Sequence, residues 1–171
     1  IAQVGFILLA ISSDDFHMAN TAVIYFVLIY IFSNIAAFGV AAVITEKTGK
    51  ETIDEYKGLY KTNPLLTWIL ALALFSLAGI PPTAGFFGKL FLITAGAAGK
   101  AYWLVLVASL NLIISLYYYL RVVRAVFMDK NEDPIEPIRL AAPVKLGLLL
   151  CGAGIVLAGL LSWIYDYIHS L

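Results

Sequence analysis

The feature that most constrains this chain is residues 21–45, a long apolar stretch without a single charged side chain. About 20 such residues carry a helix across the hydrocarbon core of a bilayer, where only helices and closed barrels satisfy all their backbone hydrogen bonds. Barrel strands alternate apolar and polar residues, whereas the apolar residues here run continuously. The sequence therefore predicts an all-α fold, a polytopic transmembrane helix bundle.

The composition agrees with a membrane protein. Hydrophobic residues make up 62% of the 171 residues and charged residues only 13%, against about 25% charged in soluble domains. Eleven basic residues balance eleven acidic ones, which leaves no basic field to attract nucleic acid. The single cysteine, Cys151, has no neighbours at metal-ligand spacing, so we expect a packing role for it and no metal or iron–sulfur site. The expected partner is the lipid bilayer.

Charged and polar stretches divide the chain, which we treat as one transmembrane domain over residues 1–171, into five apolar segments. They are a partial segment at 1–11 and further segments at 21–45, 63–98, 102–123 and 144–168. The chain opens inside an apolar run without an initiator methionine, so we expect it to be the C-terminal part of a longer protein.

Segment 63–98 is too long for one straight transmembrane helix. Its middle, residues 79–85, contains Pro81, Pro82 and Gly85. Proline removes a backbone donor and clashes with the preceding helical turn. We therefore predict two half-helices joined by a break at 79–85, with a simple packing kink as the alternative.

The basic residues predict the orientation. When the loops are assigned alternately to two sides, one side receives nearly all of them: Lys47, Lys50, Lys57, Lys61, Arg121, Arg124, Lys130, Arg139 and Lys145. The other side receives only Lys100. The positive-inside rule makes the crowded side cytoplasmic and places the C-terminus outside.

Lys89 is the one charged residue that lies well inside an apolar segment. A lysine at the centre of a lipid-exposed helix costs about 2.5–3.5 kcal/mol, so such residues usually face a bundle interior or a water-filled path. Snorkelling to the headgroups is the alternative, but Lys89 is about 13 Å from the outer end of its segment at the rise of an α-helix. Next to a proline break, a lysine can meet water and switch between charged and neutral forms. We predict that Lys89 acts as a proton relay.

Other polar residues form weaker patterns. Residues 30, 33 and 34 make one stripe on the second segment, and residues 111, 115 and 118 make another on the fourth. Such stripes can line a water wire or form interhelical hydrogen bonds. The candidates for the wall of a hydrated path are Gln3, Ser33, Asn34, Ser115 and Tyr118.

Several sequence stretches resemble one known family. They are residues 72–89 around the proline break, 115–121, 32–39 and 1–6. They are similar to the antiporter-like membrane subunits of respiratory complex I, and within them most similar to the subunit N (subunit 2) branch of bacterial NADH:quinone oxidoreductase. The proline-break stretch alone is shared with multisubunit cation/proton antiporters and membrane-bound hydrogenases.

The resemblance implies a subunit of 14 helices, of which this chain would supply the end of helix 10 and helices 11–14. Lys89 matches the lysine on the second broken helix, which belongs to the exit half of a hydrated proton path. Several relatives have histidine at the position of Gln3. Since glutamine does not exchange protons under ordinary conditions, a relay passing Gln3 would have to use water.

We therefore predict a proton-translocating membrane-arm subunit of NADH:quinone oxidoreductase in the bacterial inner membrane, with other membrane-arm subunits as partners. NADH, FMN, iron–sulfur clusters and quinone are expected in other subunits, and no cofactor in this chain. One alternative is a subunit of a monovalent cation/proton antiporter or a membrane-bound hydrogenase. Another is a structural scaffold in which Lys89 pairs with a buried carboxylate.

Overall fold

The fold is all-α in the part of the chain that a computed structural model describes, residues 2–13 and 15–160. Its helices are α1 (Ala2–Ile11), α2 (Phe16–Thr48), the short 3-10 helix η1 (Leu59–Lys61), α3 (Pro64–Ala78), α4 (Ala84–Ala98), α5 (Tyr102–Phe127) and α6 (Ala142–Leu160). No strand occurs in these residues, so the predicted fold class is confirmed. The last part of the predicted segment 144–168, from residue 161 onward, lies outside the described residues.

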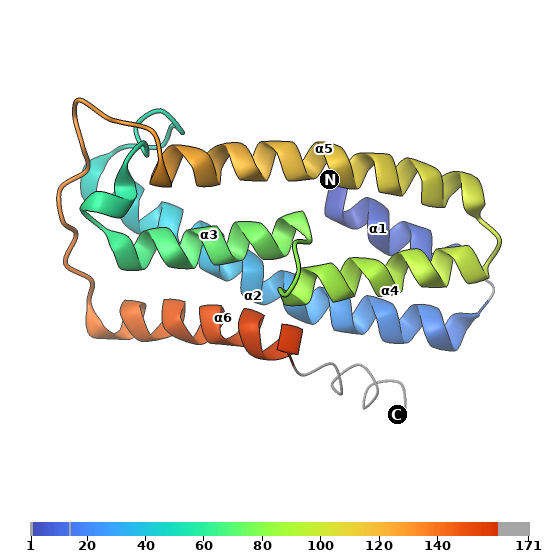
Figure 1. Cartoon of the computed structure of the whole chain (residues 1–171). Coiled ribbons are helices and arrows are strands. Elements are labelled where there is room, and N and C mark those ends of the chain that lie inside the picture. Colours follow the sequence, from blue (N-terminus) through green and yellow to red (C-terminus); the bar gives the residue numbers. More distant parts are fainter. Residues whose placement is uncertain (1, 14, 161–171) are drawn as a thin grey trace.

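The helices lie roughly along one common direction (Figure 1). α2 and α5 run most of the length of the bundle, while α3 and α4 follow one another along it as two shorter pieces. α1 packs against α4, and α6 packs against α2. By length and hydropathy, α2, α5 and α6 could each cross a membrane, whereas α1, α3 and α4 are shorter. The bundle is therefore built around a discontinuous helix.

α2 is longer than the uncharged stretch at 21–45 that marks it in the sequence. It begins after Asp15, whose side chain accepts a hydrogen bond from the Met18 backbone N–H, and it ends at Gly49, where φ is +70°. Both are standard helix-capping arrangements. Charges mark where a helix leaves the apolar environment, and the backbone of α2 stays helical beyond that point.

Two polar loops pack together at one end of the bundle. The Lys50 ammonium lies 2.6 Å from a carboxylate oxygen of Asp133. The Asn63 side-chain oxygen accepts a hydrogen bond of 2.8 Å from the Ile138 backbone N–H. The loop before α3 and the loop before α6 therefore share one polar layer, which holds most of the basic residues that predict the orientation.

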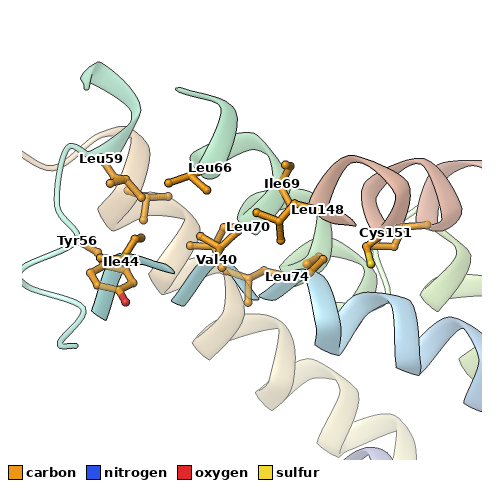
Figure 2. Close-up of a cluster of buried hydrophobic side chains, with 14 of the residues drawn as sticks. Val40, Ile44, Tyr56, Leu59, Leu66, Ile69, Leu70, Leu74, Leu148 and Cys151 are labelled. Atoms are coloured by element: carbon orange, nitrogen blue, oxygen red, sulfur yellow. The ribbon is translucent and has the colours of Figure 1, made fainter. Parts of the chain in front are cut away.

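Each half of the discontinuous helix has its own apolar core. Figure 2 shows the cluster around α3, where side chains from α2, α3, α6 and the polar loop meet: Val40, Ile44, Tyr56, Leu59, Leu66, Ile69, Leu70, Leu74, Leu148 and Cys151. A second cluster joins α1, α2 and α4 through Phe6, Ala10, Ala22, Phe26, Leu92 and Ala95. The break between α3 and α4 lies between these two cores.

Candidate functional site

The break in the helix is five residues long. α3 ends at Gly79, which adopts a left-handed φ of +81° that favours glycine. Residues 79–83, including Pro81 and Pro82, are not helical, and α4 begins at Ala84. The non-helical part is therefore shorter than the predicted 79–85, because Gly85 already belongs to the first turn of α4.

Gly85 allows the two half-helices to touch. A Cβ atom at this position would overlap the Ser76 carbonyl oxygen and would lie 2.8 Å from the Ser76 hydroxyl oxygen. The Ser76 backbone is so close to Gly85 that only a hydrogen atom fits in place of a side chain. Gly85 therefore sets how closely α4 starts against the end of α3.

Lys89 lies in the second turn of α4 and is 2% exposed. Its ammonium donates a hydrogen bond of 2.6 Å to the Leu77 carbonyl oxygen. The last carbonyls of a helix have no partner within the helix and carry partial negative charge, so α3 offers an acceptor that suits a cation. The side chain points back towards the break, as helical side chains do. A Cβ atom at Gly79 would lie 3.1 Å from Lys89 Cδ.

Phe6 of α1 covers the ammonium from another side. The Lys89 nitrogen lies 5.2 Å from the centre of the Phe6 ring, within the range of a cation–π contact. Among the described residues, no carboxylate forms an ion pair with Lys89. The charge is therefore balanced only by a carbonyl dipole and a ring face in this part of the chain.

Gln3 of α1 reaches the same carbonyl. Its side-chain nitrogen donates to the Leu77 oxygen at 2.9 Å and to the Tyr119 hydroxyl oxygen at 3.4 Å. The side chain is 5% exposed, and its oxygen has no hydrogen-bond donor among the described residues. α1, α4 and α5 thus meet at the end of α3.

Ser33 is also brought to the break. Its hydroxyl donates a hydrogen bond of 2.8 Å to the Ser76 hydroxyl, and both residues are buried. Ser76 is the residue that Gly85 contacts. α2 is therefore tied by a hydroxyl pair to the last turn of α3.

The other predicted wall residues are not brought to the break in the described structure. The Asn34 amide donates to the Tyr30 carbonyl, and the Ser115 hydroxyl to the Leu112 carbonyl, both within their own helices. Tyr118 is 39% exposed. The tyrosine that reaches Gln3 is the next one, Tyr119.

Phe6, Ser76, the Leu77 carbonyl and Tyr119 were not predicted from the sequence. Tyr119 follows Ser115 by four residues and Tyr118 follows it by three, and both spacings lie on one face of a helix. A free carbonyl near residue 77 could have been inferred from the helix end alone. Which helix supplies its donors depends on packing.

The chemistry available at this site is proton exchange. A lysine side chain can take up or release a proton without any change in the backbone, and the Leu77 carbonyl that Lys89 contacts also accepts a hydrogen bond from the Gln3 amide. Within the described residues, no group of three or more His, Cys, Asp or Glu side chains could hold a metal ion.

Comparison with known proteins identifies relatives along the whole chain. A family profile described as "NADH:quinone oxidoreductase/Mrp antiporter, TM" matches residues 1–115. The chain is 47% identical to NADH-quinone oxidoreductase subunit N of Phocaeicola vulgatus, over 99% of this chain and 36% of that protein. It is 37% identical to NAD(P)H-quinone oxidoreductase subunit 2 of Synechococcus elongatus, over 95% of this chain and 33% of that protein.

The fold also has a counterpart among solved structures. A chain of respiratory complex I from Thermus thermophilus, solved with bound aureothin, matches with a TM-score of 0.72 and 26% sequence identity, over 92% of this chain and 35% of that chain. The chain spans about a third of the length of the curated relatives that it matches.

Proposed function

Because the chain belongs to the NADH:quinone oxidoreductase/Mrp antiporter transmembrane family, we propose that it forms part of a proton-translocating subunit of NADH:quinone oxidoreductase, with Lys89 as a proton relay. The resemblance to the antiporter-like membrane subunits of complex I, and to subunit N among them, is confirmed. NADH, FMN, iron–sulfur clusters and quinone would be handled by other subunits, and the other membrane-arm subunits are the proposed partners.

The observation that carries the proposal is the position of Lys89. It is the one charged side chain that is buried in the described part of the chain, and it lies just beyond the break. Ionisable residues inside a membrane usually mark a path for ions or protons. Broken helices at membrane depth are typical of ion-coupled transporters, because their free backbone groups line the binding site.

The direction of the Lys89 side chain favours a buried relay over a lysine that snorkels to the headgroups. A snorkelling lysine directs its ammonium towards the headgroups, away from the centre of the bilayer. The Lys89 ammonium instead bonds the end of α3 in the interior of the bundle.

The scaffold alternative requires a buried carboxylate as partner for Lys89. In the described residues no Asp or Glu is buried, because the acidic side chains lie in the loops or at helix ends. If Lys89 formed a buried ion pair, loss of its proton would leave the carboxylate unpaired in the interior. No such carboxylate opposes proton release from Lys89 in the described residues.

The proposed orientation follows the basic residues. We place the polar layer of the loops before α3 and α6 on the cytoplasmic side of the bacterial inner membrane. Residues 99–101, between α4 and α5, and the C-terminus would then face outward. With this orientation Lys89, on α4, would lie in the outward half of the bundle, as the proposed exit role requires.

The test is Lys89→Ala in the full-length subunit within the assembled enzyme. In inverted membrane vesicles we expect fewer protons translocated per NADH oxidised, because the buried relay group is lost. Lys100→Ala is the matched control, since it removes an exposed lysine in the short loop that follows the same helix. The amount of assembled enzyme in each membrane is measured by native electrophoresis.

Two results would contradict the proposal. Unchanged proton translocation and quinone reduction in assembled Lys89→Ala enzyme would exclude the relay and favour a scaffold. Translocation that depends on added sodium or potassium, with or without NADH, would instead favour the cation/proton antiporter alternative.

A further inference from the structure

Gln3 and Lys89 share one hydrogen-bond acceptor. Their nitrogen atoms donate to the same Leu77 carbonyl oxygen, at 2.9 Å and 2.6 Å. The carbonyl belongs to the last turn of α3, while its two donors come from α1 and α4. The amide of Gln3 and the ammonium of Lys89 are therefore neighbours at the helix break.

The two side chains also have complementary unused groups. An ammonium has three N–H donors, and the described structure gives Lys89 one hydrogen-bond acceptor. The Gln3 side-chain oxygen is a buried acceptor that no described donor reaches. A buried amide oxygen without a donor is unfavourable, and the Lys89 ammonium, which meets the Gln3 amide at the Leu77 carbonyl, has further N–H donors to offer it.

From this arrangement we infer that Gln3 is a positioning residue that supports Lys89 in both of its protonation states. An amide carries an acceptor and two donors on one rotatable group. Its oxygen accepts a hydrogen bond from the ammonium when Lys89 is charged. Its nitrogen donates to the lone pair of the amine when Lys89 is neutral. The amide thus offers a partner to the lysine before and after proton release.

Tyr119 and the Leu77 carbonyl keep hydrogen-bond partners whichever way the Gln3 amide is turned. The Tyr119 hydroxyl, which accepts from the Gln3 nitrogen at 3.4 Å, can either accept or donate a hydrogen bond. It can therefore bond whichever end of the amide faces α5. The Leu77 carbonyl accepts from both Gln3 and Lys89, so it keeps one donor when the other turns away. The Gln3 amide, the Tyr119 hydroxyl and the Leu77 carbonyl therefore keep hydrogen-bond partners whether Lys89 is charged or neutral.

This inference rests on the proposed relay function, and variants of Gln3 test it in the full-length, assembled enzyme. Gln3→Leu removes both donor and acceptor, and loss of one hydrogen bond predicts about fivefold slower NADH-driven proton translocation. Gln3→Glu keeps the size but, when ionised, forms an ion pair that Lys89 must break to release its proton, so we expect a similar loss. Gln3→His keeps one N–H donor and one nitrogen acceptor at this position, so we expect the variant to retain most of the proton translocation.

A double variant shows whether Gln3 acts through Lys89. In the Lys89→Ala background, Gln3→Leu should cause no further loss, because there is no ammonium left to position. All rates are normalised to the amount of assembled enzyme. If Gln3→Leu does not assemble, the comparison of Gln3→Glu with Gln3→His still decides the question.

The outcomes separate the two proposals. If Lys89→Ala has no effect, the relay itself is wrong. If Lys89→Ala reduces translocation but Gln3→Leu does not, the relay stands and the role of Gln3 is overturned. Wild-type translocation in Gln3→Glu together with loss in Gln3→His would show that Gln3 serves only packing.

Discussion

Gly85 at the start of α4 lies directly against the carbonyl oxygen of Ser76 near the end of α3, so that a side chain at residue 85 would overlap the backbone. The contact explains why the two half-helices approach so closely at the break. It also places the Ser33–Ser76 hydroxyl pair beside the start of the helix that carries Lys89.

Gly85→Ala is expected to destabilise the protein by about 3 kcal/mol or more, because the backbone of α3 or α4 must move to admit the methyl group. The free energy of unfolding of the full-length subunit in detergent measures the effect. Gly147→Ala is the control, because a Cβ atom there meets nothing within 4 Å. In α6 this change should stabilise by up to about 1 kcal/mol through helix propensity. Equal effects of the two changes would refute the close contact.

Ser33 and Ser76 are expected to be energetically coupled. Each change to alanine alone breaks the 2.8 Å hydrogen bond, so the double variant should cost less than the two single variants together. The expected coupling is about 0.6 kcal/mol, as is average for such bonds in membrane helices. Ser115→Ala is the control, because its hydroxyl bonds within α5. Additive effects for Ser33 and Ser76 would contradict the pairing.

Lys89→Arg is expected to fail as a relay although it preserves the charge. Arginine stays protonated at all physiological pH values and cannot release a proton to the next group. We expect the enzyme to assemble and to translocate as few protons per NADH as Lys89→Ala, measured in inverted vesicles. Normal translocation by the arginine variant would mean that residue 89 supplies a fixed positive charge and does not cycle.

Glu55 in the polar loop before α3 provides a pH test. Hydrogen bonds from the Thr52 N–H, the Thr52 hydroxyl and the Glu51 N–H hold the pKa of this carboxylate below its ordinary value of 4.5. A lowered pKa in the folded state stabilises the fold above pH 4.5, and that contribution is lost as the pH falls through the lower, folded-state pKa.

Glu55→Gln should therefore lower the melting temperature at neutral pH, and the difference from wild type should shrink as the solution is acidified below pH 4.5. The change is expected to be small, since the carboxylate lies at the surface. Glu132→Gln is the control, because no hydrogen bond to its side chain is described. A difference for Glu55→Gln that stays constant with pH would exclude this role of the carboxylate.

The proposed orientation predicts opposite labelling of two surface positions. Lys61 and Lys100 are exposed at opposite ends of the discontinuous helix. In a cysteine-free background, a membrane-impermeant maleimide added to intact cells should label Lys100→Cys and spare Lys61→Cys. Inverted vesicles should give the reverse pattern. Labelling of Lys61→Cys from outside intact cells would contradict the proposed orientation and indicate the opposite one.

The sequence by itself determined the fold class, the discontinuous helix and the unusual lysine. These conclusions depend on properties that act along the chain: the length of apolar runs, the missing donors of Pro81 and Pro82, and the cost of placing Lys89 in lipid. None of them requires knowledge of which helices are neighbours.

The tertiary structure decided which groups surround Lys89. Helical periodicity relates residues within one helix, but the rotation and axial offset between packed helices come from how their side chains interlock. That packing brings Gln3 of α1 to the Leu77 carbonyl, selects Tyr119 over Tyr118, and leaves Asn34 and Ser115 bonded to their own helices. The partners of a buried charge are therefore a property of the packed bundle, while the charge itself is visible in the sequence.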